Sequence, residues 1–345
     1  MVNYHVLSLA LLALSSSSNA HPGHHEMADA LAKRDAHANV IQRGLEGCAS
    51  HPKYLALKER GMQRRWARAQ SLRKARGISH ELPYKSRVRR DLAQLQVYDD
   101  VNHNMTSKGY DSSTPASTLF SSYSNTSCSL SPEVVDGPYY VSGEYFRTNV
   151  VEDQEGLPVH LEYQYVDVST CDAPTKDLYL ENWQANATGV YSGIVASGNG
   201  VGTSDPSNIN NTFLRGVTKV DSEGVGYFDT LFAGHYEGRA THIHLISHVG
   251  GSVLANGTYV TGNGSTSHVG QLFFDTVLRD AVEATSPYNT NTQAVTTNDD
   301  DQWAPAAASA SYDPYPDWAY LGDDITDGLL MWIRYATRLT DIEPS

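Results

Sequence analysis

The chain has 345 residues, of which 40% are hydrophobic and 19% charged, and its formal charge is −14. This composition is that of a globular protein, and it excludes a fibre or a wholly disordered chain. Residues 1–90 carry sixteen basic against six acidic residues, a charge of +10, whereas residues 91–345 carry nine against thirty-three, a charge of −24. The acidic main part argues against nucleic acid or an anionic membrane as its partner.

Residues 1–20 have the pattern of a secretory signal peptide. An apolar run from Val6 to Leu14 precedes Ser18-Asn19-Ala20, a small-x-small cleavage pattern. The run is too short to span a bilayer, and no later segment is apolar enough to replace it, so we expect a secreted protein without a membrane segment. Six N-glycosylation sequons in the acidic part agree with export; they begin at Asn104, Asn125, Asn186, Asn210, Asn256 and Asn263.

Three cysteines in an oxidising compartment predict one disulfide. Three are too few for a scaffold built on disulfides. The sequence leaves all pairings open: Cys48 can bond to Cys128 or to Cys171, or those two can bond to each other.

Residues 21–96 form a basic extension that we expect to be helical. The stretch from Glu26 to Arg76 has few glycines and prolines, and its apolar residues recur at loose helical spacing, which predicts one or two helices; they are Leu55, Leu57, Met62, Trp66 and Leu72. The dibasic pairs Lys33-Arg34 and Arg89-Arg90 suit processing proteases, so the extension could be a removed pro-segment. It could equally be a clamp that lies on the acidic body, or a solvated helical extension with no role in the chemistry. Residues 97–127 are rich in Ser, Thr, Asn and Asp and predict a polar linker.

The body, residues 128–345, shows many short stretches of alternating polarity separated by turn residues. This pattern predicts a mainly β fold, an antiparallel β-sandwich core. The expected strands are 159–165, 177–183, 213–220, 226–232, 241–247 and 269–274. We expect long loops over 286–324, and the pattern over 328–338 fits either a closing strand or a short helix.

A pair of histidines is the first candidate site. On a strand, His242 and His244 point to the same face, so their imidazoles converge as a natural pair of metal ligands. Upstream, Trp183 to Ser192 and Phe232 to Arg239 each place a tyrosine in a turn with a glycine.

These motifs stand in an order that resembles the intradiol ring-cleavage dioxygenases, in particular the secreted fungal branch. The resemblance covers roughly residues 128–275. It opens with Cys128-Ser129-Leu130-Ser131-Pro132-Glu133 and Gly137-Pro138-Tyr139-Tyr140, continues through Phe213-Leu214-Arg215-Gly216, and closes with Gly234-x-Tyr236-x-Gly238-Arg239-Ala240-Thr241-His242-Ile243-His244.

The resemblance implies a ferric iron held by Tyr191, Tyr236, His242 and His244. Phenolates are hard anionic donors that favour Fe(III), and imidazoles supply borderline nitrogen donors. It also implies that Arg239 stabilises charge on the substrate, that Gln271 lies near the site, and that Tyr236 leaves the metal when substrate binds. The implied reaction cleaves a catechol-type diol between its two hydroxyl-bearing carbons with O2, giving a muconate-type diacid without an organic cofactor.

One departure is that Gln184 follows Trp183 where many relatives have histidine, which bears on local hydrogen bonding or substrate choice. Two other functions are compatible with parts of the sequence. A non-catalytic secreted β-sandwich could bind aromatic or carbohydrate polymer through its tryptophans and tyrosines, and a metal-dependent hydrolase could use the histidines, although tyrosinate ligands suit it poorly. The oligomeric state and the particular diol are left open.

Overall fold

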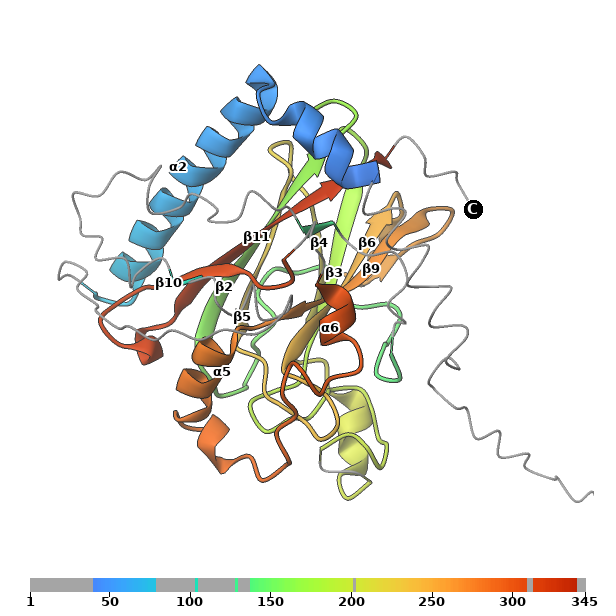
Figure 1. Cartoon of the computed structure of the whole chain (residues 1–345). Coiled ribbons are helices and arrows are strands. Elements are labelled where there is room, and N and C mark those ends of the chain that lie inside the picture. The colour runs from blue at the N-terminus through green and yellow to red at the C-terminus, as the bar shows by residue number, and fades with distance from the viewer. Residues whose placement is uncertain are drawn as a thin grey trace, which may run out of the picture.

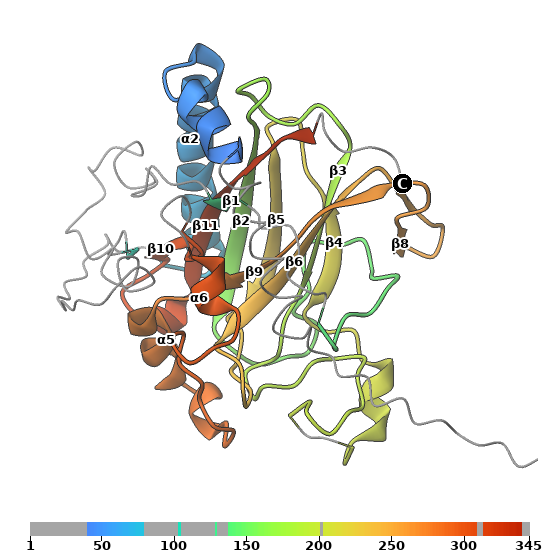
Figure 2. The ribbon, with the colours of Figure 1, turned by 45° about the vertical axis from the view of Figure 1, so that its right-hand side comes forward.

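The computed structural model describes residues 40–78, 103–104, 128–129, 137–200, 203–308 and 313–339. The proposed signal peptide and most of the proposed linker lie outside these residues. Two β-sheets pack face to face, and they appear as two layers in Figure 2. None of the described helices has the length and apolarity to cross a membrane.

The first sheet is mixed. Its strands are β1 (Cys128–Ser129), β2 (Pro158–Asp167), β5 (Val225–Leu231), β10 (Asp317–Tyr320) and β11 (Leu329–Thr337), in the order β1-β11-β2-β5 with β10 also paired to β11. The predicted antiparallel pattern holds for β2 with β5 and β10 with β11, whereas β11 runs parallel to β2 and to β1. The segment over 328–338 is thus a strand, and it lies in the middle of the sheet.

The second sheet is antiparallel, in the order β4-β3-β6-β9. Its strands are β3 (Leu178–Trp183), β4 (Arg215–Lys219), β6 (His242–Val249) and β9 (Ser265–Phe273), and a small hairpin pairs β7 (Ser252–Val253) with β8 (Tyr259–Val260). All six predicted strands are therefore present, shifted by a few residues at their ends.

The core lies between the sheets. Inward side chains such as Leu161 and Tyr163 on β2 meet Leu180 on β3 and Leu245 on β6, and all four are fully buried. Because side chains alternate along a strand, the histidines of β6 point to the opposite face of their sheet, away from this core.

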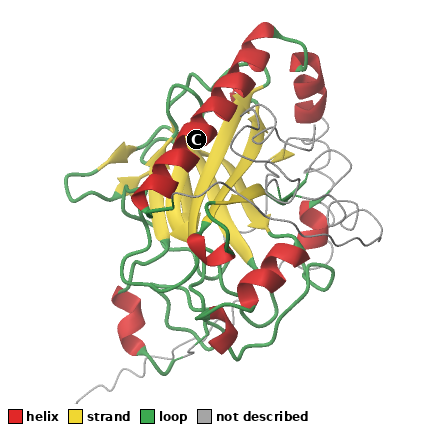
Figure 3. Ribbon diagram, turned by 90° about the vertical axis from the view of Figure 1, so that its left-hand side faces the viewer, coloured by secondary structure: helices red, strands yellow, loops and turns green. Residues whose placement is uncertain are grey.

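The N-terminal extension packs against the first sheet. A short helical segment over 40–48 leads into α2 (Pro52–Ala75), which crosses the outer face of that sheet (Figures 1 and 3). A disulfide joins Cys48 to Cys171, the residue that follows the turn after β2. The structure thus selects one of the three pairings, and it ties the extension covalently to the body.

The chain between β9 and β11 contains more regular structure than the predicted loops. It includes α5 (Thr276–Glu283), η3 (Tyr288–Thr290), α6 (Ala304–Ala307), β10 and η4 (Ile325–Asp327). A further 3-10 helix, η2 (Pro206–Asn210), lies in the long connection between β3 and β4. The predicted loops over 286–324 are therefore correct only for the intervals between these elements.

Candidate metal centre

His242 and His244 lie side by side on β6, with their Nε2 atoms 3.0 Å apart. The Nδ1 atom of His242 is 2.6 Å from the carbonyl oxygen of Ala240. Because a carbonyl only accepts, Nδ1 carries the proton, and Nε2 presents its lone pair to the site. His244 stacks on Trp183 of β3, with ring centroids 4.6 Å apart and planes 8° from parallel.

Tyr191 and Tyr236 meet the histidines from two turns. Their hydroxyl oxygens lie 3.4 Å and 3.3 Å from the Nε2 atom of His242. Tyr191 is fully buried and Tyr236 is 8% exposed. The structure therefore brings all four sequence-predicted ligands together around one point.

Glycines allow the two tyrosine turns to touch. Gly189 and Gly234 each stand two residues before a tyrosine, and each packs on the other turn. A Cβ on Gly189 would overlap the carbonyl oxygen of His235 and the amide nitrogen of Gln293, and one on Gly234 would overlap the carbonyl oxygen of Asn186. Gly189 also has φ +78°, a conformation that glycine adopts without strain.

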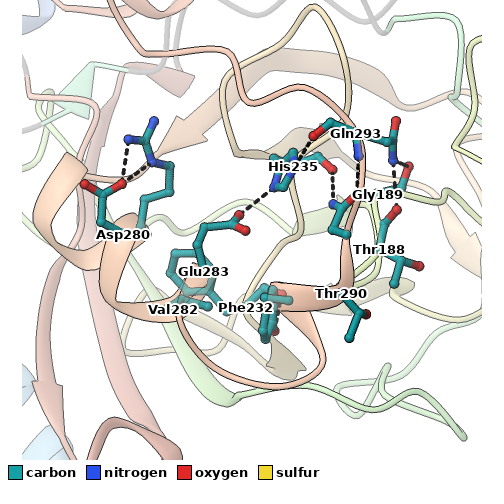
Figure 4. A network of polar contacts seen from close by, with 12 residues as sticks. Thr188, Gly189, Phe232, His235, Asp280, Val282, Glu283, Thr290 and Gln293 are labelled. Atoms are coloured by element: carbon teal, nitrogen blue, oxygen red, sulfur yellow. Dashed lines mark hydrogen bonds and ion pairs between the residues drawn. The ribbon is translucent and has the colours of Figure 1, made fainter.

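Residues at the end of α5 and after it hold the two turns from outside, as Figure 4 shows. Gln293 donates to the carbonyl oxygen of Thr188 (2.8 Å) and accepts from the backbone N–H of Glu237 (3.3 Å), so one side chain bridges both turns. His235 lies between the carboxylate of Glu283 (2.7 Å) and the carbonyl oxygen of Gln293 (3.0 Å). The sequence carried no signal for these contacts.

The protonation states suit metal binding. Burial lowers the pKa of His242 to about 3, and burial with the charges of His242 and Arg239 lowers the pKa of His244 far below its usual value. Both imidazoles are therefore neutral at pH 7, as ligands must be. Burial raises the pKa of Tyr236 to about 12 and that of Tyr191 further, so a bound cation must displace both phenol protons.

Arg239 lies beside the four donors, and it makes a partly buried ion pair. Its Nε atom donates to the Oδ2 atom of Asp301 (2.9 Å), and Nη2 donates to the Oε1 atom of Gln271 (2.5 Å). The Asp301 side chain is 0% exposed. Burial alone would raise the pKa of Asp301, but Arg239 outweighs burial and lowers it. Sequence reasoning named Arg239 and Gln271 and missed Asp301.

Gln184, which stands where many relatives have histidine, makes its hydrogen bonds away from the four candidate metal ligands. Its amide nitrogen donates to the carbonyl oxygen of Leu231 (2.8 Å) and its amide oxygen accepts from the Thr230 hydroxyl (3.3 Å), both at the end of β5. The nearby sequon residue Asn186 uses its side chain inside its own turn, where it accepts from the Val190 N–H (3.0 Å) and donates to Gln154 (2.9 Å). Both side chains stabilise the backbone that presents Tyr191.

The donor set fits a metal ion. Donors bound at about 2 Å from one ion lie roughly 3 Å from one another, and the measured separations from His242 Nε2 are 3.0–3.4 Å. In the described part of the chain, histidine, cysteine and acidic residues form no group of three or more that could hold a metal. This centre has two such residues, so it depends on the tyrosine oxygens for its remaining donors.

Comparison with known proteins finds similar solved structures. No protein-family model matches the sequence, and no curated protein matches it. An intradiol ring-cleavage dioxygenase from Tetranychus urticae is 31% identical, with 63% of this chain and 98% of that chain covered and a TM-score of 0.48. At this identity over almost the whole of that enzyme, the chain belongs to the intradiol ring-cleavage dioxygenase family.

Two further similarities are more distant. The dioxygenase domain of a carbohydrate-binding fusion protein from Streptomyces sp. SirexAA-E is 20% identical, covering 60% of this chain and 97% of that one, with a TM-score of 0.36. Catechol 1,2-dioxygenase from Pseudomonas arvilla C-1 is 15% identical, covering 59% and 60%, with a TM-score of 0.36. None of the three is described as fungal, so the resemblance to the secreted fungal branch stays a prediction.

Proposed function

We propose that this chain is a secreted Fe(III) dioxygenase that cleaves catechol-type diols between the two hydroxyl-bearing carbons. The observation that carries the proposal is the convergence of two phenol oxygens and two imidazole nitrogens on one buried point. Two phenolates favour Fe(III) among the available metals because they are hard anionic donors. The family supports the reaction class, and the metal and the secreted location are our inference.

Tyr191, Tyr236, His242 and His244 would hold the iron. When bound there, Fe(III) would supply a Lewis acid that binds the two diol oxygens and makes the ring reactive toward O2. The remaining chemistry falls to the protein. Once displaced from the metal, the Tyr236 phenolate would be a strong base that can take a proton from a diol hydroxyl, because burial raises the pKa of the free Tyr236 side chain to about 12.

Aromatic residues enclose the centre and limit water. The ring of Tyr139 lies 5.0 Å from that of Tyr191 and 6.1 Å from that of Tyr236. Its neighbour Gly137 packs on His244, where a Cβ would lie 3.2 Å from the imidazole carbon Cε1. In these low-dielectric surroundings, the charge of Arg239 acts more strongly on an anionic substrate than it would in water.

The disulfide and the N-terminal sequence support secretion, since structural disulfides persist in oxidising compartments. Export predicts protein in the culture medium that begins at His21, which N-terminal sequencing would determine. Protein retained inside cells with Met1 intact would contradict it.

The decisive test of activity is a visible spectrum of the purified protein before and after addition of catechol without oxygen. Tyrosinate-to-iron(III) charge transfer should colour the protein, and diol binding should move the band to longer wavelength. Oxygen should then yield the ring-opened diacid. A protein that stays colourless after loading with ferric iron would instead favour the non-catalytic binding module.

A further inference from the structure

The chain from the end of α5 onward holds both ends of the segment 235–240, which carries Tyr236 and Arg239. At the first end, Glu283 and Gln293 contact the His235 ring, and Asn291 donates to its carbonyl oxygen (2.8 Å) (Figure 4). At the second end, Asp301 accepts from Arg239 and from the backbone N–H of Ala240 (2.7 Å). The segment is therefore fixed from outside the sandwich, by residues 48 to 62 positions further along the chain.

Asp301 divides its two carboxylate oxygens between two tasks. Oδ1 accepts from the backbone N–H groups of Trp303 (2.7 Å) and Ala304 (2.8 Å), which fixes Asp301 to its own turn. Oδ2 accepts from Arg239 Nε and from Ala240. A buried carboxylate with four donors around it has no freedom to reorient, so the position of Arg239 follows from that of the 301–304 turn.

These contacts also fix which part of the Arg239 guanidinium is available. Asp301 occupies Nε, Gln271 occupies Nη2, and no described residue accepts a hydrogen bond from Nη1. The cation is close enough to lower the pKa of both His242 and His244. A guanidinium held at two of its nitrogens offers the third in a fixed direction, which a free arginine cannot do.

We propose that Asp301 is the positioning residue that holds Arg239 against the substrate oxygens. This inference rests on the proposed function, because it assigns the held guanidinium to a diol bound at the metal centre. Asp301 itself does not contact the four donors in any recorded hydrogen bond, so it acts through Arg239. Residues that orient groups around a metal typically contribute about 10- to 100-fold to activity.

The test compares Asp301→Ser with Asp275→Ser. Serine can still accept from backbone N–H groups at the start of a turn, but it is too short to reach Arg239. Asp275 is a matched control because one of its oxygens caps α5 at Leu278 (2.8 Å) and the other accepts from the Trp318 indole (2.9 Å), away from Arg239. We expect Asp301→Ser to lower kcat on catechol about 10- to 100-fold at unchanged iron content, and Asp275→Ser to leave kcat near the wild-type value.

A double-mutant cycle separates positioning from general damage. In an Arg239→Ala background, Asp301→Ser should cause no further loss of kcat, because the group that it positions is already gone. An equal loss in both backgrounds would overturn the proposal. Should Asp301→Ser fail to fold, Asp301→Asn preserves the side-chain volume and enters the same cycle.

A measurement without iron keeps this inference separate from the proposed function. The Nε–H proton of Arg239, identified in a nitrogen-edited NMR spectrum by its loss in Arg239→Lys, should be shifted downfield by the carboxylate. It should move in Asp301→Ser and stay in Asp275→Ser; an unmoved signal in Asp301→Ser would overturn the role of Asp301. If that shift occurs but the iron-loaded wild type cleaves no diol, Asp301 does hold Arg239. The role of this contact in diol cleavage then fails together with the proposed function.

Discussion

The orientation of the His244 ring depends on stacking against Trp183, whereas that of His242 is fixed by a hydrogen bond to Ala240. Its Nδ1 atom has no hydrogen-bond partner among the described residues, so the stacked Trp183 ring is what fixes its plane. We expect Trp183→Leu to reduce iron retention about 10-fold or more, because a ligand whose orientation is lost binds weakly. Trp183→Phe keeps an aromatic face against His244 and is the control. Iron content after dialysis measures the effect, and equal retention in both variants would show that stacking has no part in it.

Glu144 gives the protein a stability that falls as the pH rises. Burial raises its pKa to about 7, with Glu181 adding to the rise and Arg215 opposing it. A carboxyl with a raised pKa favours folding while it is protonated, so its contribution is full below about pH 4.5 and is lost as the pH passes 7. Its Oε1 atom has no hydrogen-bond partner in the described chain and lies 3.5 Å from Arg215.

Unfolding free energies of the wild type and Glu144→Gln between pH 4 and 8 measure this contribution. The wild type should lose stability relative to the variant by up to roughly 3 kcal/mol over that range. Only the slope is diagnostic, because the substitution also removes a partner of Arg215. Parallel pH profiles of the two proteins would mean that Glu144 titrates normally.

At the scale of elements, the two tyrosine turns leave no room for a side chain at their glycines. Gly189→Ala meets two penalties, a φ of +78° and an overlap with His235 and Gln293. The first costs about 1 kcal/mol and the second about 1–3 kcal/mol. Gly257→Ala is the control, because Gly257 has φ +85° but no atom within 4 Å of the added Cβ.

Thermal unfolding should therefore separate the two variants. We expect Gly257→Ala to lose about 1 kcal/mol and to retain iron, whereas Gly189→Ala loses roughly 2–4 kcal/mol and retains less iron. The difference between them isolates the contact between the turns. Similar losses of stability in both variants would show that backbone strain alone explains why position 189 requires glycine.

Helices and strands could be predicted from the sequence wherever the spacing of apolar residues followed the buried face of the element. The strands of the body alternate, so they were found. Helix α2 was expected, but its buried face was not: this face begins with Tyr54 and Leu57 and continues through Gly61, Arg65, Ala69 and Arg73, while Leu55 is 49% exposed. A buried face that mixes apolar residues with arginine and small residues gives only a weak apolar period. The partner strand β2 explains it, because its outer face presents charged and polar residues.

The four candidate metal ligands could be predicted because each lies in a local motif, on one strand or two residues after a glycine. Asp301 and Gln293 were not, since nothing in the run Asn298-Asp299-Asp300-Asp301 distinguishes one carboxylate from its neighbours. Only the path of the chain after α5 brings Asp301 to Arg239. Positioning residues of this kind depend on tertiary structure, which a single sequence does not encode in its local pattern.

At the scale of the whole molecule, the opposite charges of the two parts meet in one interface. Arg65 donates to Glu162 of β2 at 2.8 Å with both side chains buried, and Arg68 pairs with Asp229 of β5 at 3.0 Å. Burial alone would raise the pKa of Glu162, but Arg65 and Arg64 lower it. The described part of the basic extension therefore lies on the acidic body, as expected for a clamp. Removing one partner of such a buried pair typically costs about 3–5 kcal/mol.

This interface predicts what proteolytic processing would do. The dibasic pairs Lys33-Arg34 and Arg89-Arg90 lie outside the described residues, one on each side of Cys48 in sequence. Because Cys48 is bonded to Cys171, cleavage at both pairs should leave α2 attached to the body. Besides the short peptide that ends at Arg34, a gel after treatment with a protease specific for paired basic residues should show one species without reductant and two with it. A fragment containing α2 that separates without reductant would mean that the disulfide is absent in the folded protein.

The same experiment distinguishes a clamp from a pro-segment by its effect on function. Reduction of the cleaved protein removes the covalent link but leaves the buried ion pairs, so α2 should stay bound in native buffer, and iron should be retained. The disulfide closes a loop of 123 residues, and constraining a loop of this size stabilises the folded state by about 4–5 kcal/mol in the chain-entropy model. Cys48→Ser with Cys171→Ser should accordingly lower the melting temperature without changing the spectrum of the metal centre, which lies on the other sheet.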